Sequence, residues 1–135
     1  MKKLFLSLAI IGTSLVSAQD FNLEVEIVGF SNDKGNAMIG LYNTKDTFLK
    51  KGIKSSKTIV KNKKTYAIFK DVPKGEYAVS MFHDENANGK LDSNFMGIPK
   101  EDYGTSNNAK GFMGPPKYED AKFVLSSDKK IIITL

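Results

Sequence analysis

The chain contains no cysteine, no arginine and no tryptophan, and it has a single histidine. The absence of cysteine excludes disulfide bonds, thiolate metal sites, cysteine nucleophiles and lipid attachment through an N-terminal cysteine. Because all 20 basic residues are lysine, no guanidinium group is present for bidentate recognition of phosphate or carboxylate. One histidine also leaves little material for a metal site or a catalytic cluster built on several histidines.

The remaining composition is that of a globular protein. A chain of 135 residues accommodates one domain of ordinary size, and its apolar share of 41% and charged share of 26% argue against wholesale disorder. No stretch approaches about 18 consecutive apolar residues, so we expect no transmembrane segment in the mature chain. The absence of arginine and of interleaved aromatic residues also argues against a nucleic-acid partner.

Residues 1–18 have the features of a secretory signal peptide. Two lysines precede the apolar run Leu4–Ile11, and Val16–Ala18 offers the small residues at which a signal peptidase cuts. The apolar run is too short to span a bilayer core of about 30 Å. We therefore expect cleavage near Ala18, an extracytoplasmic location (periplasmic or secreted), and a mature chain, residues 19–135, that forms a single β-sandwich domain.

From Asp20 onward apolar residues recur with period two, which is typical of strands with one buried face. Seven segments show this pattern: 21–27, 36–42, 58–60, 65–69, 76–82, 122–125 and 130–135. We expect an all-β fold, an antiparallel β-sandwich of about seven strands with immunoglobulin-like architecture and one long irregular loop. The turn residues at 31–35 and 61–64 predict hairpins between the strands that flank them.

The long loop is the segment 84–120, which contains five glycines, three prolines and five asparagines and has no clear period. A loop of this length in a compact domain is usually functional, and its apolar residues indicate that much of it packs on the sandwich. It opens with Asp84–Asp92, DENANGKLD, which matches the first nine positions of an EF-hand type of calcium loop. This is the strongest local signal for a binding site.

The spacing in this loop has a physical reason, because side chains at the first, third and fifth positions point inward as the chain curls around a hard cation. The expected metal ligands are Asp84, Asn86, Asn88, the main-chain carbonyl of Lys90, and Asp92. Position twelve is a phenylalanine instead of a bidentate glutamate, so we expect weak Ca²⁺ binding, with a Kd on the order of 10⁻⁴–10⁻³ M. Leu91 is expected to pack into the core. The alternative is a tight turn without an ion, in which Asn and Asp side chains cap their own backbone.

His83 immediately precedes the loop. A lone histidine is more often a packed or hydrogen-bonded residue than a ligand or a proton shuttle. The alternative function is a ligand-binding or enzymatic pocket formed by residues 83–120, with His83, Glu85, Glu101 and Tyr103 lining it. Glu85, Glu101 or Asp102 are also the remote carboxylates available to complete a calcium shell. We assign no catalytic residue and no cofactor other than Ca²⁺.

Charge is divided unevenly along the chain. Eight lysines and no acid lie between Asp46 and Asp71, whereas ten acids and six lysines lie from Asp71 to Asp128. Lysines protect an exposed edge strand against pairing with another chain. They also attract an anionic partner such as an envelope glycan or another anionic surface. We favour the first explanation.

The run Phe69–Val79, FKDVPKGEYAV, resembles the motif with which a strand begins in transthyretin-like (prealbumin-like) and Cna-B-like sandwiches. The resemblance implies that Pro73 and Gly75 turn the chain and that Tyr77 packs inward. Further motifs along the chain resemble the bacterial exported family called domain of unknown function 2141: 83–86, 88–92, 97–101, 103–104, 106–109, 114–116 and 119–121.

This second resemblance covers residues 21–135, with Ala87 and Lys110 standing where glycine or another small residue is expected. It implies an exported sandwich but no activity, and it transfers no catalytic residue. The sequence therefore predicts an exported module with a binding or structural role, not an enzyme.

Overall fold

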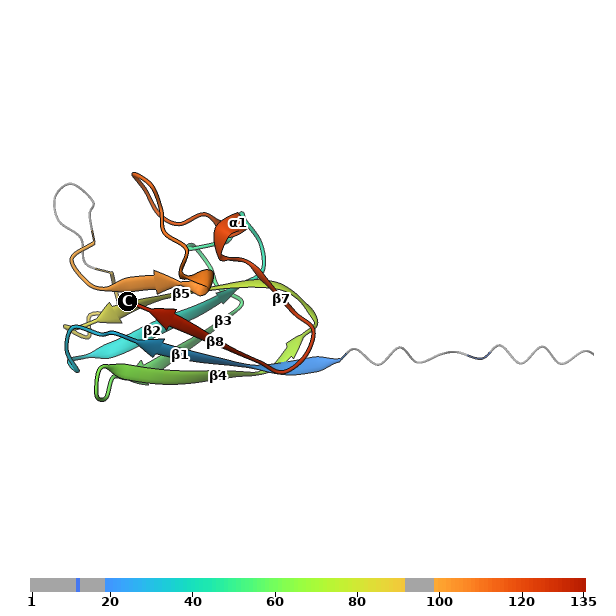
Figure 1. The fold of residues 1–135 in the computed structure, drawn as a ribbon, viewed down its shortest axis with the longest axis horizontal. Helices are drawn as coiled ribbons and strands as arrows, with labels where there is room; N and C mark the ends of the chain where they lie inside the picture. Colours follow the sequence, from blue (N-terminus) through green and yellow to red (C-terminus); the bar gives the residue numbers. More distant parts are fainter. Residues whose placement is uncertain (1–11, 13–18, 92–98) are drawn as a thin grey trace, which may run out of the picture.

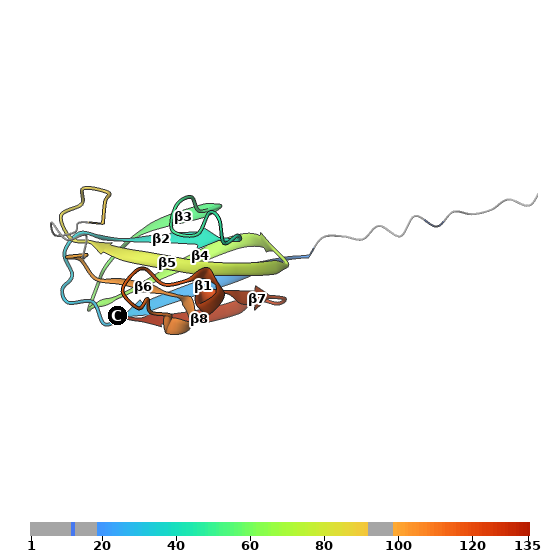
Figure 2. The ribbon, with the colours of Figure 1, turned by 90° about the horizontal axis from the view of Figure 1, so that it is seen from above.

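The computed structural model describes residue 12 and residues 19–91 and 99–135. Eight strands in this part of the chain form two sheets that lie face to face (Figures 1 and 2). The predicted all-β sandwich is therefore confirmed. The predicted signal peptide lies, apart from residue 12, outside the described residues.

The first sheet has the order β4-β1-β8. Its central strand β1 (Asp20–Val28) pairs antiparallel with β4 (Lys64–Pro73) and parallel with β8 (Lys129–Thr134). Leu23, Val25 and Ile27 of β1 are fully buried, as the alternation in the sequence predicts.

The second sheet has the order β3-β2-β5-β6. It consists of β2 (Asn36–Tyr42), β3 (Lys54–Ile59), β5 (Gly75–Asp84) and the short strand β6 (Tyr103–Thr105), all paired antiparallel. A further short strand, β7 (Phe123–Leu125), pairs with the beginning of β5. Because β2 occupies one edge of β5, β6 and β7 share the other edge and pair with different stretches of it.

The hairpin predicted at 31–35 is wrong, and the one predicted at 61–64 is confirmed only at its turn, where Lys61 and Lys64 form an antiparallel bridge. β1 and β2 belong to different sheets, and so do β3 and β4. The turn at 31–35 carries the chain from one sheet to the other and lies across one end of the sandwich. Period two shows that one face of a strand is buried, but it does not show which strand is the partner.

The hydrophobic core lies between the sheets and receives alternate residues from both. It includes Leu23, Val25, Ile27, Ala37, Ile39, Leu41, Ala67, Phe69, Tyr77, Val79, Met81, Leu125 and Ile133. The Tyr77 hydroxyl donates a hydrogen bond to the carbonyl of Pro73 (2.6 Å), which ties β5 to the turn before it. Tyr77 thus packs inward as the resemblance implied.

Part of the long loop packs on the outer face of the second sheet, as expected. It contains a 3₁₀ turn, Ser106–Asn108, and the single-turn helix α1 (Tyr118–Ala121), which lies above β5 in Figure 1. The buried Ser106 hydroxyl accepts a hydrogen bond from the Val79 amide (2.9 Å) and donates one to the Ala121 carbonyl (2.6 Å). Burial raises the pKa of the Tyr118 phenol to about 12, so this side chain is neutral at physiological pH.

Candidate metal sites at the end of β5

Three side chains that can ligate a metal converge where β5 ends. His83 and Glu85 are two residues apart, so an extended chain directs both to the same face. The segment before β6 continues the pairing with β5, because the His83 amide donates a hydrogen bond to the Asp102 carbonyl (2.8 Å). Asp102 is thereby placed directly across from His83, and cross-strand partners share a face of the sheet.

The His83 ring is held firmly at the end of the core. The residue is fully buried, and Phe30 contacts the ring edge-on with centroids 5.0 Å apart. Its Nε2 atom is hydrogen-bonded to the backbone carbonyl of Lys34, and a carbonyl oxygen only accepts. Nε2 therefore carries the proton of the neutral ring, and Nδ1 presents a lone pair. Nδ1 is buried and has no hydrogen-bond partner among the described residues.

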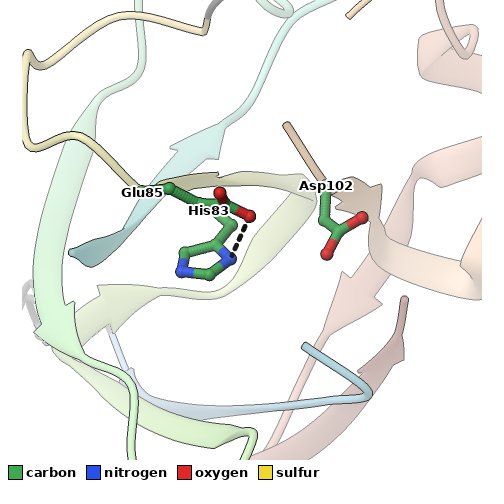
Figure 3. Close-up of side chains that lie close together, drawn as sticks. All are labelled: His83, Glu85 and Asp102. Atoms are coloured by element: carbon green, nitrogen blue, oxygen red, sulfur yellow. Dashed lines mark ion pairs between the residues drawn. The ribbon is translucent and has the colours of Figure 1, made fainter. Parts of the chain in front are cut away.

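Two carboxylates stand beside this nitrogen (Figure 3). Glu85 Oε1 lies 3.7 Å from His83 Nδ1 and also accepts a hydrogen bond from the Asn32 amide group. Asp102 Oδ2 accepts hydrogen bonds from both the amide and the hydroxyl of Ser31. One donor atom from each of the three residues lies within 4.8 Å of the other two. The connection between β1 and β2 thus supports both carboxylates and the far side of the ring.

The predicted calcium loop curls on itself immediately after β5. Asn88 and Gly89 donate their amides to the two carboxylate oxygens of Asp84, at 3.1 and 2.7 Å. The Asn86 side-chain oxygen accepts from the Asn88 amide, and the Asn88 side-chain oxygen accepts from the Lys90 amide. Alternate side-chain oxygens therefore lie on the inner side of one turn. Each Asp84 carboxylate oxygen has lone pairs that its hydrogen bond to one amide does not use.

Asp84 is almost completely buried, with a relative exposure of 1%. No lysine or histidine in the described part of the chain lies within ion-pair distance of its carboxylate. Removing a carboxylate charge from water is costly unless a cation or several donors compensate. Two backbone amides supply part of that compensation.

Of the two remaining predicted ligands, only Lys90 lies within the described residues. Lys90 follows the turn, whereas Asp92 lies outside them. The expectation that Leu91 packs into the core is wrong, since its side chain is 38% exposed. The chain has by that point left the sheet, so Leu91 lies over the outer face and not between the two layers.

The residues of the alternative pocket divide between two faces of the sheet. Tyr103 is paired with Phe82, so it faces away from His83. Tyr103, Phe82, Ser80 and Met113 line an outer groove of about 880 Å³ beneath the long loop. Glu101 instead accepts a hydrogen bond from the Glu85 amide (3.0 Å) and is 8% exposed. His83, Glu85 and Glu101 are therefore not part of this groove.

The lysine-rich segment forms two sheet edges. β3 is the end strand of the second sheet and β4 the end strand of the first. Lys54 of β3 donates a hydrogen bond from Nζ to the Lys70 carbonyl of β4 (2.7 Å), which joins the two edges. This position supports the interpretation that the lysines protect edge strands.

Sequence reasoning named all three residues of the cluster but did not group them. The spacing His83-x-Glu85 at the end of a predicted strand was a usable signal, because period two puts both side chains on one face. The contribution of Asp102 depended on the pairing of two segments 19 positions apart, which the irregular sequence between them conceals.

Comparison with known proteins identifies a matching family. A family profile matches residues 25–133, and the family is described as "Uncharacterized protein conserved in bacteria (DUF2141)". Neither the curated proteins nor the solved structures that were searched give a match. None of the described helices is long and apolar enough to cross a membrane. The matched region contains most of the two sheets and the residues at the end of β5. Because the match covers most of the sequence, the chain belongs to the bacterial family known as domain of unknown function 2141.

Proposed function

We propose that the protein is an exported β-sandwich module with a binding or structural role, and that a calcium ion held by residues 84–92 stabilises its long loop. The ligands are Asp84, Asn86, Asn88, the carbonyl of Lys90, and Asp92. Ordering a loop costs on the order of 1–2 kcal/mol per residue, and an ion that binds only the folded chain offsets part of that cost.

The calcium proposal rests on the environment of the Asp84 carboxylate. Its carboxylate is almost completely buried, yet it has no cationic partner in the described part of the chain. The amides of Asn88 and Gly89 orient its two oxygens without using all their lone pairs. A calcium ion supplies the missing positive charge and accepts oxygen ligands in flexible geometry.

Calcium should raise the melting temperature of the protein. With a Kd on the order of 10⁻⁴–10⁻³ M, about 10 mM Ca²⁺ stabilises the folded state by roughly 1.4–2.7 kcal/mol. We expect an increase of several degrees over a sample with chelator, and we expect Asp84→Asn to abolish the increase. Thermal unfolding followed by circular dichroism measures both.

The control for this experiment is Glu119→Gln, the same loss of one charge at an exposed residue of α1. It should leave the calcium-dependent shift unchanged. An equal melting temperature with calcium and with chelator would reject the proposed ion and leave a self-capped turn.

Export is the second part of the proposal, and it is supported by the composition of residues 1–18. The protein recovered from outside the cytoplasm of a bacterial host should begin at Gln19, and N-terminal sequencing reads this directly. Recovery of the uncleaved chain from the cytoplasm would contradict it. An envelope glycan or an anionic surface is the partner that the excess of lysine in the segment 46–71 would suit.

A further inference from the structure

The geometry points to a second, chemically different cation site: His83, Glu85 and Asp102 bind a zinc ion. This site uses none of the side chains assigned to calcium. Asp84 lies between His83 and Glu85 in the sequence, and neighbouring side chains of an extended strand face opposite ways. The two ions would therefore occupy different sides of the end of β5.

The first argument is that the Nδ1 atom of His83 is buried without a hydrogen-bond partner in the described part of the chain. A fully buried polar atom without a hydrogen-bond partner is rare, and Nδ1 of His83 is such an atom among the described residues. In the neutral tautomer that donates from Nε2 to the Lys34 carbonyl, Nδ1 has a lone pair available for a metal. Zinc-binding histidines characteristically donate their other ring N–H to a carbonyl or carboxylate in this manner, which fixes the tautomer and the ring orientation.

The second argument is the charge around this nitrogen. Glu85 and Asp102 bring two negative charges to the same face, and one donor atom from each lies within 4.8 Å of the others and of the imidazole donor. Two carboxylates together balance the charge of one divalent ion. Their hydrogen bonds from Asn32 and from Ser31 hold them in place as supports around the ligands of a metal do.

The third argument selects the metal. Calcium takes six to eight oxygen ligands, whereas imidazole nitrogen together with carboxylate oxygen suits zinc. Three protein ligands leave a fourth position of a tetrahedral zinc for water. Ligand atoms of tetrahedral zinc lie roughly 3.4 Å apart, given bonds of about 2.1 Å. The side chain of Glu85 is 37% exposed, so it can make the adjustment, at most about 1.4 Å, from separations within 4.8 Å to this spacing.

Zinc binding can be tested on the purified full chain without a histidine tag. Calorimetric titration with ZnCl₂ should show one site per chain. Because His83 is the single histidine, ¹⁵N NMR of the imidazole observes this site alone. We expect an Nε2-protonated ring before zinc is added, and a large change of the Nδ1 signal when one equivalent has bound.

Glu85→Gln and Asp102→Asn should each weaken zinc binding at least tenfold, whereas Asp84→Asn and Glu119→Gln should not. The two cluster variants replace partly exposed side chains with similar shapes, so they should fold. Zinc binding that leaves the His83 signals unchanged, or no zinc binding at all, would overturn this assignment and leave His83 and Glu85 as a simple ion pair. Loss of the calcium effect with zinc binding intact contradicts only the calcium proposal.

Discussion

Gly35→Ala destabilises the folded protein by about 2–4 kcal/mol. A Cβ atom at this position would lie 1.9 Å from the Asp84 carbonyl oxygen and 2.7 Å from that of Glu85. The backbone there also has φ +61°, a left-handed conformation that L-residues adopt at a cost. The connection between β1 and β2 must therefore move away from the end of β5. Urea unfolding of the variant and the unaltered chain measures the difference.

Gly89→Ala is the matched control for this prediction. Gly89 has a similar backbone conformation (φ +77°), but an added Cβ would meet no atom of the described residues within 4 Å. Its cost should be about 1 kcal/mol, that of the backbone strain alone. Equal costs for the two variants would show that the β1–β2 connection is not packed against Asp84 and Glu85. In that case the support described for His83, Glu85 and Asp102 would be absent.

Ile133→Ala should cost about 2–5 kcal/mol, because it removes a fully buried side chain from the core. Ile133 lies in β8 beside Ile27 of β1, in the parallel pair at the edge of the first sheet. A cavity at this position would remove contacts from both strands. The free energy of unfolding in urea is again the measurement.

Ile132→Ala is the neighbouring control, since Ile132 is 52% exposed on the opposite face of β8. We expect a cost of about 1 kcal/mol or less. The contrast between adjacent isoleucines tests the register of β8. A larger loss at Ile132 than at Ile133 would mean that the strand is shifted by one residue, because such a shift exchanges its two faces.

Most strands could be predicted from the sequence because their signal is local, but β6 lies in the segment expected to be irregular, and β3 was expected at 58–60 instead of Lys54–Ile59. Asn36–Tyr42 was located with its observed bounds, and the turn between Pro73 and Gly75 was recognised from its own residues. The pairing of whole strands could not be predicted: the turn at 31–35 forms no hairpin, and the hairpin at 61–64 extends no further than the bridge between Lys61 and Lys64. A turn at 31–35 looks the same in the sequence whether the next strand joins the same sheet or crosses to the other. Packing of the whole domain decides between them.

The same distinction applies to the residues at the end of β5. The calcium loop is a local pattern, and the structure shows the alternate oxygens of Asp84, Asn86 and Asn88 turned inward. The cluster with His83 depends on a strand pairing that brings Asp102 across from it, and no spacing within one segment contains that information. The burial of His83 likewise depends on the folded arrangement of the two sheets and cannot be read from the sequence around it.

Soaking crystals of the protein with calcium and solving the structure tests the central proposal most directly. We predict a calcium ion with oxygen atoms of Asp84, Asn86 and Asn88 at about 2.3–2.6 Å. The Asp84 carboxylate should keep its hydrogen bonds from the amides of Asn88 and Gly89 while it binds the ion. Oxygen atoms of these three side chains turned outward into solvent, with no ion among them, would contradict the proposed role of the loop.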